Sequence, residues 1–171
     1  AMERERIRRE AQQELWRLRV QHRLRAWRSG GQFTGRGAGA QAPQVRATVI
    51  LIRHGYSEDN LSNRFTGWVD AELSGRGREE ARLAGSILRE SGVKRVERVY
   101  CSMLKRSIKT AWLMLDEMEM QWVPITYNWR LNERHYGALQ GREKRECGAE
   151  YGYCQVAKWR RGVSDAPTPT A

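Results

Sequence analysis

The feature that most constrains this sequence is a short apolar run that ends in a cation, an imidazole and a glycine. The run, Thr48 to Ile52, is rich in β-branched residues and apolar at every position, which is typical of a strand buried on both faces of a parallel sheet. Arg53, His54 and Gly55 follow it directly. Because open α/β sheets bind ligands beyond the carboxyl ends of their strands, we expect a binding site here.

Each of these three residues brings a property that an anion site uses. Arg53 offers a planar fork of donors that matches phosphate or carboxylate. His54 can act as a nucleophile, a base or a proton carrier, and Gly55 lets the backbone turn sharply and approach a ligand. A strand end with a solvated Arg and a hydrogen-bonded His fits the tripeptide equally well.

A strand-helix-strand-helix order follows, which predicts a parallel, doubly wound sheet. Ser74 is an acceptable N-cap for a helix that ends at Ser91 and Gly92. A second strand is expected over Val96 to Cys101, and Ser102 opens a second helix. Five residues of that helix are expected to point inward: Leu104, Ile108, Ala111, Trp112 and Leu115.

The start of the second helix repeats the chemistry of the first junction. Ser102 and Arg106 lie about one helical turn apart, at a helix end where backbone N–H groups favour anions. Two such junctions at one sheet edge can share a phosphate. For Lys105 and Arg106 considered alone, a solvated helix face is the alternative.

Further along, one segment is dense in groups that titrate or donate. Trp122 to Thr126 reads as a short edge strand, and Leu131 to Gly137 follows it. Within the second segment, Glu133 is flanked by cationic and phenolic groups, which suits a general acid or base and equally a structural ion pair. The pattern from 142 to 161 predicts a helix broken by Gly148 and Gly152.

The first 46 residues hold most of the positive charge. Ala1 to Arg46 carries 11 Arg, no Lys and 4 Glu, a net +7, which leaves +4 of the total of +11 for the remainder. Apolar residues at helical spacing between Ile7 and Leu18 precede a Gly- and Ala-rich linker, 35–43. We interpret 1–46 as an extension without a fixed fold. RNA binding, membrane contact and an organellar address are its alternatives, although its glutamates argue against a typical transit peptide.

Length and composition fit one ordinary domain. The chain has 171 residues, 40% of them hydrophobic, and seven Trp. No apolar stretch is long enough to span a bilayer and no secretory leader opens the sequence, so we expect a soluble, cytoplasmic protein. Cys101, Cys147 and Cys154 are odd in number and lack metal-ligand spacing, which predicts reduced thiols, by default buried, and no metal site.

Several motifs follow one another along the sequence in an order that matches a known family. They are Arg53-His54-Gly55-x-Ser57, Asn60, Asn63 to Trp68, Leu104 to Ile108, Leu131 to Gly141 and Trp159-Arg160-Arg161. In order and spacing they resemble cofactor-dependent phosphoglycerate mutase, in the histidine phosphatase superfamily. The resemblance covers about Thr48 to Arg161, and the 131–141 block is specific to the mutase and bisphosphoglycerate mutase branch. It implies a three-layer, mostly parallel doubly wound α/β fold.

The resemblance also implies roles for individual residues. His54 resembles the phosphoryl acceptor, which is primed by 2,3-bisphosphoglycerate. Arg53 and Arg106 would clamp the equatorial phosphoryl oxygens, and Glu133 would carry the proton of the substrate hydroxyl. Other positions resemble residues that hold phosphate, sugar-acid oxygens or carboxylate: Ser57, Asn60, Thr66, Gly67, Tyr136, Lys144, Arg160 and Arg161. No metal is implied, because cationic side chains take its role.

Three departures limit what the resemblance implies. Tyr56 and Asp59 stand where the family usually has Glu and Trp, and Cys101 stands where it usually has Thr. Family members also continue through a second His-Gly-Asn-Ser segment, and no residue after Arg161 matches it. We therefore expect the amino-terminal part of a mutase, an incomplete sequence with a truncated pseudoenzyme as the alternative, with very low turnover of its own and with exposed sheet edges.

The motifs are consistent with three functions of different class. The first is a mutase that interconverts 3-phosphoglycerate and 2-phosphoglycerate in glycolysis and gluconeogenesis, through a phosphohistidine. The second is a bisphosphoglycerate mutase or phosphatase of the same superfamily. The third is a non-catalytic protein that binds anions, or RNA through the Arg-rich extension. The predicted regions are the extension 1–46, a catalytic region 47–163 and a tail 164–171; the predicted partners are phosphorylated three-carbon acids, with homo-oligomers left open.

Overall fold

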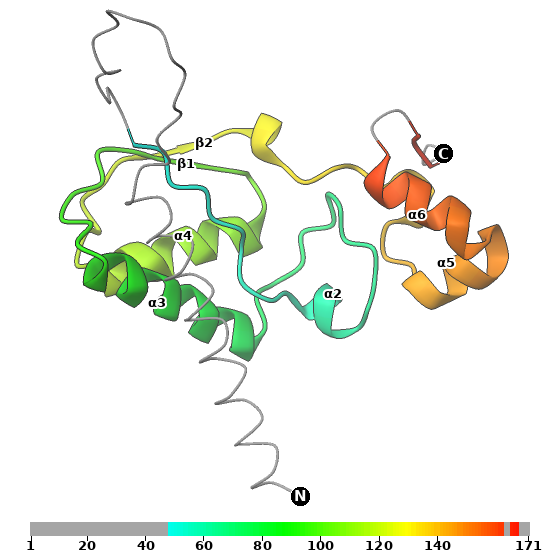
Figure 1. Cartoon of the computed structure of the whole chain (residues 1–171), viewed down its shortest axis with the longest axis horizontal. Coiled ribbons are helices and arrows are strands. Elements are labelled where there is room, and N and C mark those ends of the chain that lie inside the picture. The colour runs from blue at the N-terminus through cyan, green and yellow to red at the C-terminus, as the bar shows by residue number, and fades with distance from the viewer. Residues whose placement is uncertain (1–47, 163–164, 168–171) are drawn as a thin grey trace, which may run out of the picture.

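The computed structural model describes residues 48–162 and 165–167. The expected extension and linker, and most of the tail, lie outside these residues, so the predicted region boundaries stay predictions. Helices and strands follow one another as Figure 1 shows. Their bounds are α2 (Glu58–Leu61), α3 (Gly75–Glu90), β1 (Val99–Cys101), α4 (Lys105–Glu117), β2 (Ile125–Tyr127), η1 (Trp129–Leu131), η2 (Gly137–Leu139), α5 (Lys144–Tyr151) and α6 (Tyr153–Arg161).

A strand-helix-strand unit forms one end of the described structure. β1 and β2 are parallel neighbours, with Val99 opposite Ile125 and Cys101 opposite Tyr127, and α4 connects them. The Asn128 N–H donates to the Cys101 carbonyl at 2.9 Å, which extends the pairing beyond β2. Parallel strands need such a crossover. The predicted α/β class, with a parallel sheet and helices, is therefore confirmed.

The larger apolar cluster packs α3 and α4 together with the two strands. Helix α3 begins after Ser74, whose hydroxyl accepts from the Gly77 N–H at 3.1 Å, as its predicted N-cap role requires. Gly85 lets the two helices approach closely, because a Cβ there would meet the Met114 carbonyl at 2.7 Å. The buried members of the cluster are Leu88, Met114, Leu115, Met118, Met120 and Val123. The cluster thereby fixes α4, whose first turn carries Arg106.

A second, smaller cluster lies under α5 and α6, at the other end of the described structure from α3 (Figure 1). Its buried residues are Phe65, Leu139, Cys147 and Val156, with Tyr136 and Trp159 packed against them. Main-chain hydrogen bonds tie the loop before Phe65 to this cluster: Phe65 N–H donates to Arg142 O at 2.9 Å, and Gly141 N–H donates to Phe65 O at 2.7 Å. These bonds fix the 63–70 loop against the smaller cluster.

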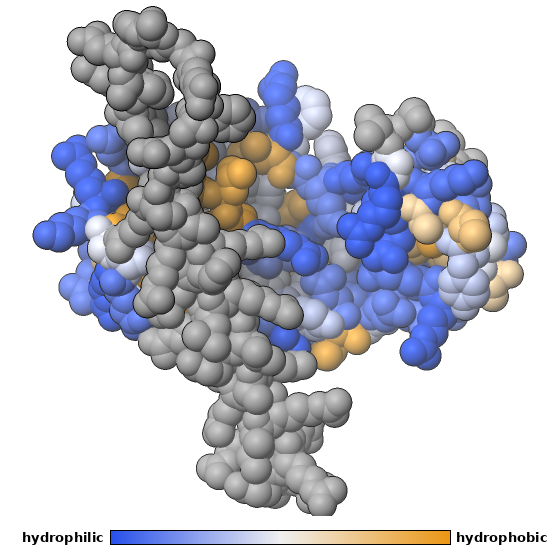
Figure 2. Space-filling view, viewed as in Figure 1, coloured by the Kyte–Doolittle hydropathy of each residue, from blue (hydrophilic) through white to orange (hydrophobic). Residues whose placement is uncertain are grey.

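The prediction that Thr48 to Ile52 forms a buried strand is wrong. The segment is extended, without strand pairing, and its side chains are exposed, 91% for Leu51 and 74% for Val49. In the described part of the chain, β1 and β2 pair with each other and not with this segment. A continuous apolar run is buried only where neighbouring strands and covering layers meet it. Figure 2 shows apolar surface, in orange, among the mostly polar surface of this face.

The strands and α4 also differ from their predicted bounds. β1 starts at Val99 rather than Val96, β2 is shifted toward the carboxyl end, and α4 begins at Lys105. Leu104 and Leu115 are buried as expected, and Ile108 and Ala111 are half-buried. Trp112, expected inside, is 53% exposed. Arg106 and Thr110 are buried on the inward face of α4 instead. Their hydrogen bonds in the candidate active site, described below, account for this burial.

Two smaller predictions are corrected in the same way. Gly148 does not break a helix, since α5 runs through it and ends before Gly152, which has a φ of +83°. Cys101 and Cys147 are buried free thiols as expected, whereas Cys154, in α6, is exposed. Among the described helices, none has the length and apolar character that a bilayer span needs.

Candidate active site

The backbone around His54 is held between α3 and α4. The Gly55 N–H donates to the Thr110 hydroxyl at 3.1 Å, and the Tyr56 N–H donates to a carboxylate oxygen of Glu80 at 2.9 Å. Gly55 has no room for a side chain, because a Cβ would lie 2.2 Å from the Gly77 carbonyl oxygen. The sequence therefore needs glycine here for a close backbone approach.

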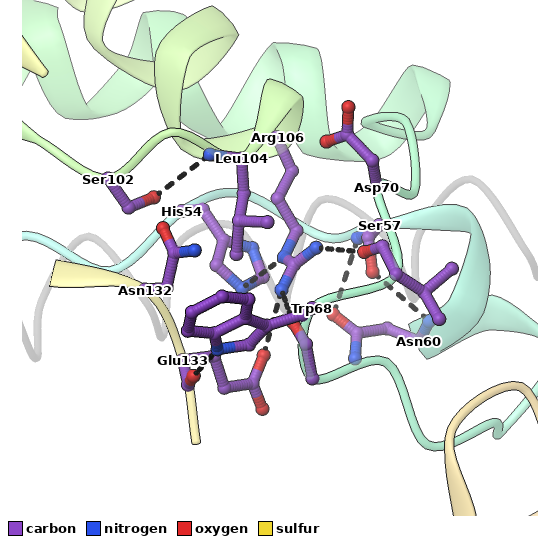
Figure 3. Close-up of polar contacts among 12 residues, drawn as sticks. His54, Ser57, Asn60, Trp68, Asp70, Ser102, Leu104, Arg106, Asn132 and Glu133 are labelled. Atoms are coloured by element: carbon purple, nitrogen blue, oxygen red, sulfur yellow. Dashed lines mark hydrogen bonds and ion pairs between the residues drawn. The ribbon is translucent and has the colours of Figure 1, made fainter. Parts of the chain in front are cut away.

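Three predicted catalytic residues meet in space (Figure 3). The Arg106 Nε–H donates to Nε2 of His54 at 3.3 Å, and Arg106 Nη2 lies 3.0 Å from Oε2 of Glu133. The three come from the loop before α2, the first turn of α4 and the loop after η1. The structure thus joins an imidazole, a guanidinium and a carboxylate from distant parts of the chain.

Arg106 is fully buried, with 0% of its surface exposed. Besides His54 and Glu133, it donates to the Val69 carbonyl at 2.9 Å and to the Gly67 carbonyl at 2.8 Å. A buried charge is tolerated only when it is paired and hydrogen-bonded in this way. The 67–69 loop therefore wraps the guanidinium and sets its orientation, which rules out the solvated helix face for Arg106.

The environment of His54 keeps its imidazole neutral. Burial lowers the pKa of His54 most, and the charges of Arg106 and Arg53 lower it further. A hydrogen bond from Nδ1 to the Gly55 carbonyl at 2.7 Å and the charge of Glu133 oppose this. Because a carbonyl can only accept, Nδ1 carries the proton and the lone pair of Nε2 faces Arg106.

An aromatic group supports Glu133 from the side. The Trp68 indole N–H donates to the Glu133 carbonyl at 2.8 Å. The Trp68 ring lies 6.1 Å from the Trp129 ring and 5.6 Å from the His135 ring, between centroids. The Glu133 side chain itself remains 36% exposed. Its carboxylate is thus held at the edge of the site while still reaching solvent or a ligand.

Ser57 and Asn60 are used within the protein. They form a capping box at α2, in which the Asn60 N–H donates to the Ser57 hydroxyl at 3.2 Å and the Ser57 N–H donates to Oδ1 of Asn60 at 3.3 Å. Thr66 is buried, and Gly67 takes part through its carbonyl. Next to Asn60, Asp59 holds a buried carboxylate oxygen with no hydrogen-bond partner among the described residues.

The remaining predicted residues form a basic group beside this centre. Burial lowers the pKa of Lys144, and the charges of Arg160 and Arg53 lower it too, while Glu133 and Asp59 raise it. Burial and the charge of Glu133 raise the pKa of Tyr136, against Arg134, Arg160 and Arg161. Arg53, Arg160 and Arg161 are themselves exposed. The charge of Glu133 therefore acts on both Lys144 and Tyr136, which indicates that this basic group lies near the Glu133 carboxylate.

Sequence reasoning missed two positions of the site. Thr110 accepts from the Gly55 N–H and lies one turn after Arg106 on the same face of α4, a polar residue at helical spacing that could have marked it. Trp68 was named above only as the last residue of a motif and was given no role, although its indole N–H holds Glu133. Within the described residues, no cluster of three or more His, Cys, Asp or Glu is placed to hold a metal ion.

Together, the parallel α/β fold and the histidine set among buried and exposed cations define an α/β protein with a candidate anion site. The sequence matches the histidine phosphatase superfamily (branch 1) over residues 49–170. The chain belongs to this superfamily. It is 53% identical over 119 residues to the 2,3-bisphosphoglycerate-dependent phosphoglycerate mutase of Blochmanniella pennsylvanica, a match that covers 70% of this chain and 51% of that protein.

Solved structures agree with the fold. A mycobacterial glucosyl-3-phosphoglycerate phosphatase in complex with VO3 superposes with a TM-score of 0.58 at 29% identity, over 67% of this chain and 51% of its own. An Escherichia coli protein described as a putative alpha-ribazole-5'-P phosphatase gives a TM-score of 0.56 at 30% identity, over 68% and 55%. These relatives confirm the predicted fold class. The chain spans about half the length of the relatives it matches.

Proposed function

We propose that this chain carries the phosphoryl-accepting residues of a 2,3-bisphosphoglycerate-dependent phosphoglycerate mutase. The enzyme would interconvert 3-phosphoglycerate and 2-phosphoglycerate through a phosphohistidine on His54. The observation that carries the proposal is the direct contact of Arg106 with both His54 and Glu133. The 53% identical relative, a protein with this printed activity, supports the choice of substrate.

His54 is prepared for nucleophilic attack on phosphorus. Its Nδ1 proton is bound to the Gly55 carbonyl, so the Nε2 lone pair forms the new bond to phosphorus. The bond from phosphorus to the donor oxygen breaks, and its electron pair stays on that oxygen. Arg106 and Arg53 hold the equatorial oxygens, where charge resides during the transfer. Arg106 Nε, now 3.3 Å from Nε2, would turn its N–H to a phosphoryl oxygen.

Glu133 is the proton carrier in this mechanism. When a phosphoryl group leaves the substrate, a protonated Glu133 gives its proton to the freed oxygen. In the return step the Glu133 carboxylate takes the proton of the substrate hydroxyl as that oxygen attacks phosphorus. The 3.0 Å contact between Arg106 and Glu133 places the carboxylate beside the transferring group. Acid and base are therefore the same side chain in opposite half-reactions.

The residues around the centre fit a ligand with two phosphates and a carboxylate. Positive charge comes from Lys144, Arg160 and Arg161, and the Tyr136 hydroxyl is a neutral donor. These groups are additional to the guanidinium groups of Arg53 and Arg106 near His54. When bound, 2,3-bisphosphoglycerate supplies the phosphoryl group that primes His54. Ser57, Asn60, Thr66 and Gly67 are proposed to line the oxygens nearest to the acceptor. In this scheme the cationic side chains stabilise the negative charge of the transferring phosphoryl group.

Product analysis tests the proposal. The chain is incubated at high concentration with 3-phosphoglycerate and 2,3-bisphosphoglycerate, and products are followed by phosphorus NMR. We expect slow formation of 2-phosphoglycerate that depends on His54, because conversion of that residue to Gln removes the nucleophile. The variant Arg145→Gln, at an exposed position of α5 outside the proposed site, is the control. Inorganic phosphate as the main product would reject the mutase.

A phosphatase of the same superfamily is the second candidate. Two of the solved relatives are described as phosphatases, and a phosphatase uses the same acceptor but lets water complete the reaction. Tyr56 and Asp59, which stand beside the acceptor, depart from the pattern of the mutases that the sequence resembles. The same experiment separates the two candidates, since the phosphatase releases one inorganic phosphate for each ester bond it breaks, whereas the mutase converts 3-phosphoglycerate to 2-phosphoglycerate without net release of phosphate.

A further inference from the structure

The Thr110 hydroxyl lies between the acceptor loop and helix α4. Thr110 is 4% exposed. Its Oγ1 accepts from the Gly55 N–H at 3.1 Å and donates to the Arg106 carbonyl at 2.7 Å. One hydroxyl thus touches the backbone of the residue after His54 and the backbone of Arg106. His54 and Arg106 are the two side chains whose contact defines the candidate active site.

The direction of these two bonds is fixed by chemistry. The Arg106 carbonyl can only accept, so the single hydroxyl proton of Thr110 points to it and a lone pair faces the Gly55 N–H. A Thr hydroxyl bonded to the carbonyl four residues earlier is common in helices and by itself indicates nothing. The second bond is different, because it spans 55 residues and joins a buried loop to the helix.

The residues next to His54 are also held on the side of the loop that faces α3. The Gly55 carbonyl accepts from Nδ1 of His54 at 2.7 Å. The Tyr56 N–H is bound to Glu80 of α3, and Gly55 lies against the Gly77 backbone. Helix α3 therefore holds the loop from one side. The Thr110 hydroxyl bonds the main chain of the loop to α4, the helix on which Arg106 lies.

We infer that Thr110 is a positioning residue, which holds the imidazole of His54 in register with the guanidinium of Arg106. The inference rests on the proposed role of His54 as phosphoryl acceptor. Thr110 does not touch the reacting atoms and acts through the Gly55 peptide. Loss of its hydroxyl removes the bond between the loop main chain and α4 and leaves the Gly55 N–H buried without a partner. The distance from Nε2 of His54 to Arg106 then varies.

Three variants test this role. Thr110→Val removes the hydroxyl at nearly constant volume, and Thr110→Ser keeps the hydroxyl. Thr126→Val, in β2, makes the same chemical change at a half-buried Thr outside the site. Each folded variant is checked by circular dichroism. Nitrogen-15 NMR of His54 then reports its tautomer and pKa, and single-turnover labelling with 2,3-bisphosphoglycerate reports the rate at which His54 is phosphorylated.

We expect Thr110→Val to lower the phosphorylation rate about 10- to 100-fold, the usual effect of a small displacement of a reacting group. Its His54 should lose the single Nδ1–H tautomer, while Thr110→Ser and Thr126→Val should match the wild type. Arg106, Arg53 and Glu133, whose charges act on His54, are unchanged in all variants. A change in the titration of His54 in a variant therefore reports a change in the position of its imidazole relative to these charges.

Other results overturn the inference. If Thr110→Val keeps the wild-type tautomer and rate, or if Thr110→Ser is as defective as Thr110→Val, the hydroxyl does not position His54. Equal defects in Thr110→Val and Thr126→Val mean a general loss of stability and also overturn it. If the wild type is never phosphorylated while the tautomer changes in Thr110→Val alone, the proposed function fails and the positioning role stands.

Discussion

His54 and Arg106 depend on each other. Arg106 brings a buried positive charge next to the imidazole, and that charge helps to keep the imidazole unprotonated. The neutral imidazole in turn accepts one of the hydrogen bonds that a buried guanidinium needs. A change at either residue is therefore felt at the other, and both can be measured directly.

The first prediction concerns protonation of His54. Because burial and two nearby Arg lower its pKa, His54 should titrate below the ordinary value of 6.5 in the folded protein. Between the lowered pKa and 6.5 the unfolded chain binds more protons, so this group makes stability rise with pH across that window. Proton NMR titration, native and in urea, measures both values. A native pKa at or above the urea value would contradict the electrostatics described above.

The second prediction concerns the shape of Arg106. Arg106→Lys keeps the charge but removes the planar fork that reaches His54, Glu133 and two carbonyls. We expect phosphorylation of His54 to slow by about 100- to 1,000-fold, the effect of losing a preorganised donor. Arg82→Lys, at an exposed position of α3, is the matched control. Equal rates in the two variants would show that charge alone suffices.

At the scale of single residues, the sequence predicted which side chains come together better than it predicted the residues that hold them in place. The motifs around His54, Arg106 and Glu133 were assigned to one site, and the structure brings the three together. Thr110 was missed because an apolar periodicity assigns the inside of a helix to apolar residues. A buried polar residue is understood only when its partners, here a loop 55 residues away, are seen.

Among the elements, the extended segment before His54 differs most from expectation. Its apolar residues match a central strand in composition, yet β1 and β2 are not its partners in the described structure. Burial of a strand depends on neighbours that are distant in sequence, whereas a helix cap such as Ser74 depends on residues three positions away. This is why the start of α3 was predicted correctly and the first strand was not.

The third prediction follows from this difference. Leu51 is 91% exposed and Leu73 is 0% exposed. Leu51→Ala should therefore change the free energy of unfolding by less than about 0.5 kcal/mol. Leu73→Ala should cost about 2–5 kcal/mol, because it removes packed methyl groups and leaves a cavity. Urea unfolding of this chain measures both values. A large loss for Leu51→Ala would mean that the segment is buried in solution.

The fourth prediction tests the contact between α3 and α4. A Cβ at Gly85 would meet the Met114 carbonyl oxygen at 2.7 Å and Cβ of Glu117 at 2.9 Å. Gly85→Ala should force the helices apart and cost about 1–3 kcal/mol. At Gly75, in the same helix, a Cβ meets nothing within 4 Å. Gly75→Ala should be neutral or stabilise by up to about 1 kcal/mol, and a similar loss in both variants would exclude helix packing as the cause.

At the scale of the whole molecule, the site draws on both apolar clusters. His54 and Arg106 are fixed by α3 and α4, whereas Lys144 and Arg160 belong to α5 and α6. The 63–70 loop joins the two, since Gly67 and Val69 bind Arg106 while Phe65 is buried under α5 and α6. Charge composition indicated a basic chain but not this division, which depends on how the loop folds.

The central claim is that His54 accepts a phosphoryl group, and covalent labelling tests it most directly. The chain is incubated with phosphorus-32-labelled 2,3-bisphosphoglycerate, quenched, digested and mapped, beside the variant His54→Gln. We predict an acid-labile label on the peptide that contains His54, and no such label in the variant. A label that is stable to acid, or one that persists when His54 is replaced, would contradict the account.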